Sequence, residues 1–133
     1  MSESDDELDA IRQQKRDDLV EQGSGSDAPT EPVYLNGEAE FEEFVGSHDV
    51  VLVDFYADWC GPCKMLEPTV ETLAADSPAA VAKVDIDANQ PLAQSFGIRG
   101  VPTLHVYAGG QRVEQFVGVQ DEATLRSAIE QHA

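Results

Sequence analysis

Hydrophobic and polar positions from residue 33 onward form short strand-like runs that alternate with helix-like stripes. The run Val50 to Tyr56 (VVLVDFY) is almost continuously apolar, which is typical of a central strand covered on both faces. Phe41, Phe44 and Val45 precede it at the spacing of an amphipathic helix. By the same reasoning we expect strands at residues 33–35, 50–56, 80–84, 103–108 and 112–117.

Helical stripes separate most of these strands. One helix is expected to open at Cys60, a short one starts near Gln90, and Asp121 caps the last. The resulting order is βαβαβαββα, in which helix crossovers require parallel strands and the glycine pair at 109–110 turns an antiparallel hairpin. The sequence therefore predicts an α/β domain with a mixed five-stranded sheet sandwiched by four helices.

The first 32 residues have a different character and are interpreted as an acidic extension outside the domain at 33–133. Residues 4–22 fit one helix, but its apolar stripe is narrow, so a marginal helix, a disordered tail and a partner-binding helix all remain open. Residues 23–32 (GSGSDAPTEP) have the composition of a flexible linker. We place the domain boundary at Pro32 or Val33.

Acidic residues dominate the whole chain, with 26 Asp and Glu against 8 Lys and Arg and a net charge of −18. The first 32 residues hold ten acidic and three basic side chains, so the domain itself is acidic too. Such a surface repels phosphates and anionic lipids, which argues against nucleic acid and membrane partners. A lysine-poor acidic domain fits a halophilic protein in a salt-rich cytoplasm; an ordinary acidic protein is the alternative.

Neither a signal peptide nor a transmembrane segment is expected. The first twenty residues are charged, and nowhere do about eighteen apolar residues run together. We therefore expect a soluble, cytoplasmic protein. In that reducing compartment a pair of cysteines is more plausibly catalytic than structural.

The segment from Asp58 to Lys64 (DWCGPCK) holds both cysteines of the chain, three positions apart. If Cys60 lies where a helix begins, unpaired N–H groups and the positive end of the helix dipole stabilise its thiolate. Cys63, one turn on, can then close a disulfide with it. Pro62 suits an early helical position, and Gly61 allows another backbone to approach. Such a pair can cycle between dithiol and disulfide.

Two other uses of the cysteines deserve comparison. As a structural staple, the pair would close a very short loop and constrain little of the unfolded chain. A zinc site needs two more soft ligands, whereas the three histidines lack ligand spacing, so no metal site is predicted within one chain. A metal or iron–sulfur module in which two chains each supply two thiolates remains an alternative.

Asp54 is unexpected within the apolar run VVLVDFY. A buried, unpaired carboxylate costs several kcal/mol, so either its pKa rises or a cation lies beside it. Lys83, which interrupts the apolar run AVAKVDI, is the candidate partner. A carboxyl group of raised pKa near a thiol pair would suit general-base chemistry; capping of buried backbone groups is the alternative.

Taken together, several segments between residues 33 and 132 resemble the thioredoxin family. They are DFYADWCGPCK, the Glu67-Pro68 step, Asp85 and Asp87, FGIRGVPTL, the Gly109-Gly110 hairpin and Phe116-Val117-Gly118. The resemblance implies a thioredoxin fold with Cys60 as attacking thiol and Cys63 as resolving thiol. It also implies a buried Asp54 linked to Lys83. A cis Pro102 would pack against the cysteines, within a docking surface made of Trp59, Gly61, Pro62, Val101, Pro102 and Gly118.

The activity implied by this resemblance is reduction of protein disulfides by a monomer without a bound cofactor. Because no dinucleotide-binding glycine pattern is present, NADPH, FAD or another electron source is expected on a partner reductase of the thioredoxin reductase kind. A disulfide oxidase or isomerase of the same fold is the alternative. The chain departs from the family at Tyr56, where tryptophan is common, and at His105, which we expect to be partly covered and without a role in proton transfer.

Overall fold

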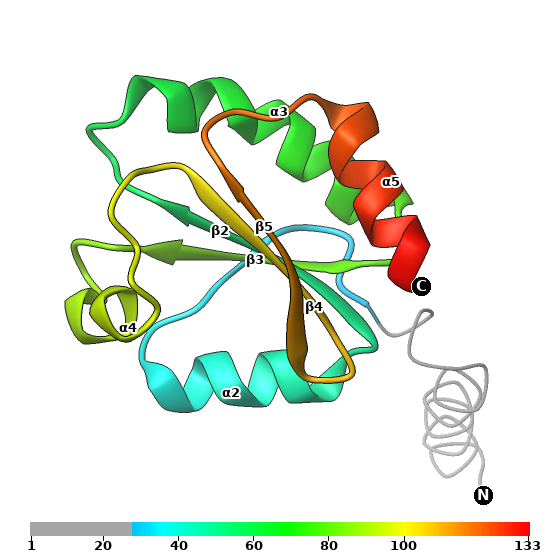
Figure 1. The fold of residues 1–133 in the computed structure, drawn as a ribbon, viewed down its shortest axis with the longest axis horizontal. Helices are drawn as coiled ribbons and strands as arrows, with labels where there is room; N and C mark the ends of the chain where they lie inside the picture. The colour runs from blue at the N-terminus through cyan, green and yellow to red at the C-terminus, as the bar shows by residue number, and fades with distance from the viewer. Residues whose placement is uncertain (1–27) are drawn as a thin grey trace, which may run out of the picture.

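The sheet runs through the centre of residues 28–133, the part of the chain that this computed structural model describes (Figure 1). Its strands are β1 (Val33–Tyr34), β2 (Val50–Tyr56), β3 (Ala80–Asp85), β4 (Thr103–Ala108) and β5 (Gln111–Val117). The helices are α2 (Glu38–Ser47), α3 (Gly61–Asp76), α4 (Gln90–Ser95) and α5 (Glu122–His132). The helix expected at 4–22 and most of the linker at 23–32 lie outside the described residues.

The strands lie in the order β1-β3-β2-β4-β5. β3 pairs in parallel with β1 and β2, because helices connect these strands across the faces of the sheet. β4 pairs antiparallel with β2 and with β5. The β4–β5 turn uses Gly109 and Gly110, whose φ angles of 61° and 83° are readily adopted by glycine. This mixed sheet with four helices confirms the predicted fold class.

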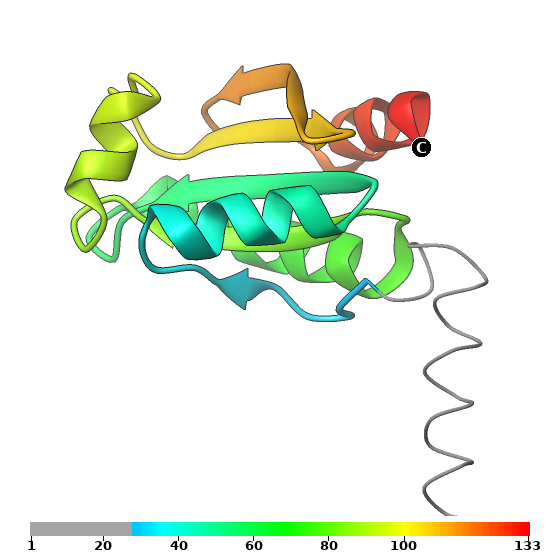
Figure 2. The same cartoon turned by 90° about the horizontal axis from the view of Figure 1, so that it is seen from below.

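Helices α3 and α5 cover one face of the sheet, and α2 and α4 cover the other (Figures 1 and 2). Side chains alternate along β2, so Leu52 packs with α3 and α5 while Val53 packs with α2. Each face also receives one fully buried polar side chain from a central strand. Asp54 lies on the α3 side and His105 on the α2 and α4 side.

Element boundaries follow the apolar pattern to within a residue or two. The boundary difference that matters most for the cysteines is at α3. The sequence predicted a helix opening at Cys60, whereas α3 begins at Gly61 with Cys60 as its N-cap. Asp121 caps α5 as expected, because its side chain accepts a hydrogen bond from the Thr124 amide at 2.8 Å. No helix within residues 28–133 is both long and apolar enough to cross a membrane.

Candidate active site

The two cysteines form a disulfide at the start of α3, with their Cα atoms 5.2 Å apart. Cys60 has extended backbone angles and occupies the N-cap, and the Cys63 amide donates a hydrogen bond to Cys60 Sγ at 3.1 Å. This sulfur thus receives one of the amides that a helix start leaves unpaired. After reduction, the same amide and the helix dipole stabilise negative charge on Cys60. Pro62 costs no hydrogen bond in this first turn.

Little of either cysteine reaches the surface, since 3% of Cys60 and 2% of Cys63 are exposed. Their neighbours in this small apolar cluster are Ala57, Tyr56, Ile86 and Val101. Cys60 Sγ lies 3.7 Å from the carbonyl oxygen of Val101, so the segment before β4 faces the disulfide directly.

The Val101–Pro102 peptide bond is cis, as the resemblance implied, and Pro102 is buried. Its carbonyl accepts a hydrogen bond from the Gly118 amide at 2.8 Å, which ties the start of β4 to the end of β5. Gly118 has a φ of 93°, a conformation that favours glycine. The Thr103 hydroxyl donates to the Gly100 carbonyl at 2.6 Å. These bonds fix the segment that faces the disulfide.

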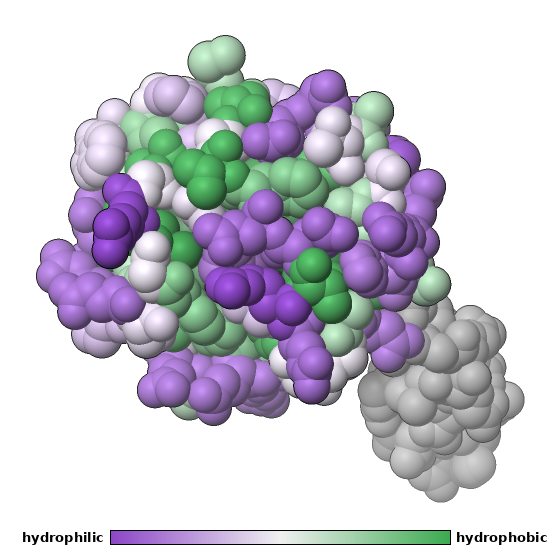
Figure 3. Space-filling view, in the orientation of Figure 1, coloured by the Kyte–Doolittle hydropathy of each residue, from purple (hydrophilic) through white to green (hydrophobic). Residues whose placement is uncertain are grey.

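Exposed apolar side chains come from the residue before Cys60, from α3 and from the end of β5. Trp59 is 69% exposed, and its indole N–H donates to Asp87 Oδ2 at 2.9 Å, which fixes the ring orientation. Met65 and Val117, with 72% and 64% exposure, extend the apolar surface. Figure 3 shows green surface over α3 and the end of β5, bordered by hydrophilic residues. The sequence prediction included Trp59 but assigned no role to Met65, Val117 or Asp87.

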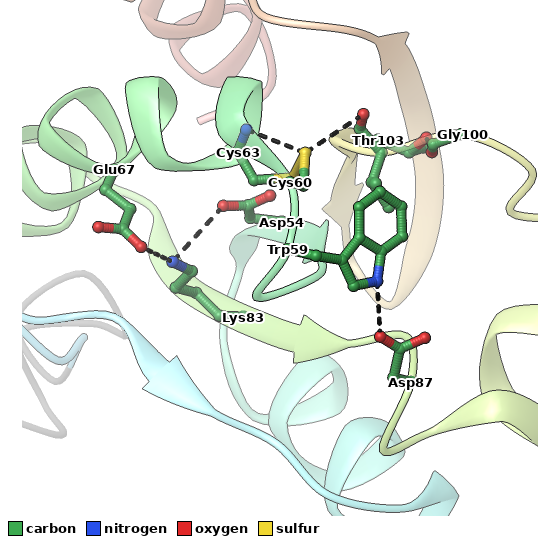
Figure 4. The surroundings of a disulfide bond; sticks show 10 residues. Asp54, Trp59, Cys60, Cys63, Glu67, Lys83, Asp87, Gly100 and Thr103 are labelled. Atoms are coloured by element: carbon green, nitrogen blue, oxygen red, sulfur yellow. Dashed lines mark hydrogen bonds and ion pairs between the residues drawn. A yellow bond between two sulfur atoms is a disulfide. The ribbon is translucent and has the colours of Figure 1, made fainter.

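Asp54 lies on the inner side of the site, and in the view of Figure 4 it is between the disulfide and Lys83. Its side chain is fully buried, and neither carboxyl oxygen has a hydrogen-bond partner among the described residues. Burial raises the Asp54 pKa to about 7; the Lys83 ammonium acts to lower this pKa and the Glu67 carboxylate to raise it. The carboxyl group therefore exchanges a proton near neutral pH.

Lys83 is the register partner of Asp54 across the β2–β3 pair, which explains why two charged residues interrupt neighbouring apolar strands. The Lys83 ammonium lies 4.0 Å from Asp54 Oδ2 and 3.6 Å from Glu67 Oε2. It also lies 4.5 Å from the centre of the Tyr56 ring and 5.6 Å from that of Tyr34. The predicted Asp54–Lys83 pair is thus present, but it shares its lysine with a second carboxylate.

His105 is fully buried, so the expectation of a partly covered side chain was wrong. The reason is that β4 lies inside the sheet, between β2 and β5, with helices over this face. The imidazole packs edge to face against Phe55 and Phe96, and burial lowers its pKa to about 4. Its face of the sheet is opposite to that of Asp54.

The family model for thioredoxin matches residues 32–131. The chain belongs to the thioredoxin family. A thioredoxin of Chlamydia muridarum is 43% identical to it over 101 residues, which cover 75% of this chain and 98% of that protein. Thioredoxin 1 of a Nostoc species is 42% identical over 98 residues, or 71% of this chain and 92% of that one.

A solved structure of a mutant thioredoxin from Halobacterium salinarum NRC-1 is also similar, with 56% identity and a TM-score of 0.77. That comparison covers 79% of this chain and 93% of the other. As a member of the thioredoxin family, the chain is a thiol–disulfide oxidoreductase whose redox pair is Cys60 and Cys63. Within residues 28–133, no three His, Cys, Asp or Glu side chains gather at a place that could hold a metal ion.

Sequence reasoning also assigned no role to Glu67, the second carboxylate beside Lys83. It was recognised as part of a family-like segment but given no role. It follows Cys63 by four residues in α3, so the two side chains lie on the same helix face, one turn apart. That spacing was the available signal.

Proposed function

We propose that this chain reduces disulfide bonds in other proteins, with Cys60 as the attacking thiol and Cys63 as the resolving thiol. The Cys60 thiolate attacks one sulfur of the substrate disulfide, whose other sulfur leaves as a thiolate and takes a proton from water. Cys63, once deprotonated, then attacks Cys60 Sγ and releases the second substrate thiolate. Two electrons pass to the substrate, and the protein is left with the Cys60–Cys63 disulfide.

The observation that carries this proposal is the position of the pair at the helix start. Cys60 occupies the N-cap, where it receives the Cys63 amide and the positive end of the helix dipole, so its thiolate is stabilised. Cys63 lies in the first turn of α3, and its sulfur is already bonded to that of Cys60 in this structure. This asymmetry favours Cys60 for attack and Cys63 for resolution.

Asp54 serves in this proposal as the base that takes the proton of Cys63. A pKa of about 7 leaves the carboxyl group half ionised at neutral pH, which suits both acceptance and later release of a proton. Lys83 supplies the compensating positive charge at 4.0 Å. Lys83 is therefore assigned a supporting role next to the catalytic carboxyl group.

The docking surface proposed for substrates surrounds the disulfide. Apolar contact would come from Trp59, and the exposed Gly61 and Pro62 leave room for a substrate backbone at the helix start. Val101, Pro102 and Gly118 form the opposite side. Because the Pro102 carbonyl is already bonded to Gly118 and proline has no N–H, an extended substrate segment would form its hydrogen bonds with Val101.

Partners follow from the same chemistry. A separate reductase of the thioredoxin reductase kind, carrying NADPH and FAD or another electron source, would restore the dithiol, and disulfide-containing proteins would consume it. We propose that the chain acts as a monomer, with residues 33–133 as the catalytic domain and residues 1–32 as an appended acidic extension.

A salt-rich cytoplasm is the proposed setting. The net charge of −18 would destabilise a compact chain through self-repulsion at low ionic strength, and multimolar salt would screen that repulsion. The similarity to a Halobacterium salinarum thioredoxin supports this proposal. A melting temperature that stayed the same between low and multimolar KCl would contradict it.

The direct test is insulin reduction by the full chain, with dithiothreitol as electron donor. We expect Cys60→Ser and Cys63→Ser each to lose turnover above the dithiothreitol background. Cys63→Ser should accumulate a covalent adduct with insulin that mass spectrometry detects, whereas Cys60→Ser should form far less of it. Turnover by Cys60→Ser at the rate of the unmodified protein would refute the proposal.

Equilibration with glutathione redox buffers separates the alternatives of the same fold. A reductase must have a reduction potential below that of the glutathione pool, because its dithiol has to donate electrons in the presence of that pool. A potential above that of the pool would instead indicate an oxidase or isomerase.

A further inference from the structure

Lys83 lies between two carboxylates that differ greatly in their exposure. Asp54 on β2 is fully buried, whereas the Glu67 side chain on α3 is 46% exposed. The ammonium is nearer to Glu67, at 3.6 Å, than to Asp54, at 4.0 Å, and both distances exceed that of a good hydrogen bond. One ammonium group is thus shared by two carboxylates, and it lies farther from the buried Asp54 than from Glu67.

The other groups around Lys83 supply no further positive charge to Asp54. The Tyr56 ring, from β2, and the Tyr34 ring, from β1, hold the ammonium by cation–π contact. Tyr56 stays neutral, because burial raises its pKa to about 12, helped by nearby carboxylates. A hollow of about 380 Å³, lined by residues including Tyr34, Glu67 and Lys83, admits water to this side of the lysine. Across β4, the register partner of Asp54 is the apolar Leu104.

We propose that Glu67 is a positioning residue for the Asp54 base: it draws the Lys83 ammonium toward solvent and so prevents a full ion pair between Lys83 and Asp54. This inference rests on the proposed role of Asp54. A fully paired Asp54 would be too weak a base to accept the proton of the Cys63 thiol. With the ammonium shared, Asp54 takes that proton and becomes a neutral carboxylic acid, Cys63 becomes the thiolate, and the carboxylic acid later returns the proton to water.

The electrostatic balance at Asp54 supports this role. The negative charge of Glu67 acts to raise the Asp54 pKa, against the lowering effect of Lys83. Removing the Glu67 charge therefore has two effects of the same sign. It takes away a repulsive charge, and it frees Lys83 to approach Asp54. Both effects stabilise the Asp54 carboxylate and lower its pKa.

Glu67→Gln tests the proposal, with Glu71→Gln as its matched control. Glu71 is exposed, lies one turn further along α3 and borders the same hollow, but among residues 28–133 it forms no ion pair. Both variants remove one negative charge without changing the side-chain shape. The Asp54 carboxyl group is titrated by carbon-13 NMR in the reduced full-length protein, and thermal unfolding checks that each variant is folded.

We expect the Asp54 titration midpoint to move to lower pH in Glu67→Gln and to stay in place in Glu71→Gln. The pH profile of mixed-disulfide resolution should change in two ways. Its acid limb should move to lower pH, because Asp54 with a lower pKa is ionised at lower pH. Its plateau rate should fall, because a carboxylate of lower pKa is a weaker base. Asp54 with a pKa of about 7 is half ionised at pH 7, so its ionised fraction there can rise by at most about twofold.

Two results would overturn the proposal. One is an unchanged Asp54 midpoint in Glu67→Gln, and the other is an equal change in Glu71→Gln, which would indicate a general charge effect. A moved midpoint with an unmoved rate profile has a different meaning: the influence of Glu67 on the carboxyl group stands, and Asp54 is not the base.

Discussion

Asp54 and His105 are two fully buried titratable side chains on opposite faces of the same sheet. Burial shifts each toward its neutral form, because it raises the Asp54 pKa to about 7 and lowers the His105 pKa to about 4. Their neighbours differ. Asp54 faces the ammonium of Lys83 and lies on the side of the disulfide, whereas His105 is packed among aromatic rings, with a long contact of 3.5 Å to the Tyr107 hydroxyl.

With the role proposed for Asp54, this contrast means that burial alone does not make a titratable group functional. At neutral pH the imidazole of His105 is already uncharged, because burial lowers its pKa and the Arg112 guanidinium acts in the same direction. Its ring contacts are aromatic. It fills space in the core below α2 and α4. Asp54 has its pKa at working pH and a reactive pair of sulfurs on its side of the sheet. Position relative to charge and chemistry distinguishes the two.

Replacing Asp54 or His105 should have its largest effect on how the free energy of unfolding depends on pH, and the two effects should have opposite signs. In the unfolded chain the imidazole titrates near pH 6.5 and the carboxyl group near pH 3.8. Between about pH 4 and 6.5 the unfolded state therefore holds a proton on His105 that the folded state lacks, so acidification destabilises the fold. Over a similar range the folded state holds a proton on Asp54 that the unfolded state lacks, so acidification stabilises it.

These two contributions, roughly 3 kcal/mol each, oppose one another in the unmodified chain. On going from pH 7 to pH 4, the free energy of unfolding of Asp54→Asn should fall relative to the unmodified protein by roughly that amount. That of His105→Leu should rise by a similar amount. Urea unfolding at several pH values measures both, and the double variant should again run parallel to the unmodified protein. Parallel curves for the single variants would contradict the assigned pKa directions.

A smaller effect is expected from His105→Leu at pH 7. His105 Nε2 has no hydrogen-bond partner among the described residues, and a buried unpaired polar atom is destabilising. Leucine has a similar volume, so we expect a gain of about 1 kcal/mol in the free energy of unfolding. Insulin reduction should be unchanged. A loss of stability, measured by urea unfolding, would show that both imidazole nitrogens are satisfied in solution.

Much of the fold could be predicted because its apolar pattern is simple. VVLVDFY reads as a central strand, and the structure places it at the middle of the sheet. The Asp54–Lys83 pairing was also predictable, since a single carboxylate and a single ammonium interrupt two apolar runs. The register of the β2–β3 pair sets the two side chains beside each other, so both face the same helix layer.

The features that could not be predicted from the sequence are contacts between segments that lie far apart along the chain. The depth of His105 follows from the strand order, which places β4 between β2 and β5, and no local pattern states that order. The bond from Trp59 to Asp87 joins the loop before α3 to the loop after β3. The contact between Glu67 and Lys83 requires a known orientation of α3 over β3, although the four-residue spacing from Cys63 placed Glu67 on the right helix face.

The central claim is that the buried carboxyl group on the disulfide side acts as a base and the buried imidazole on the other face does not. The most direct measurement is the pH dependence of Cys63 attack on a thionitrobenzoate mixed disulfide formed at Cys60, followed by release of the coloured thiolate. We expect an inflection near pH 7 in the unmodified chain and in His105→Leu. In Asp54→Asn the inflection should be absent and the rate at pH 7 lower by about 100-fold. An Asp54→Asn variant that retained both the rate and the inflection would contradict the account.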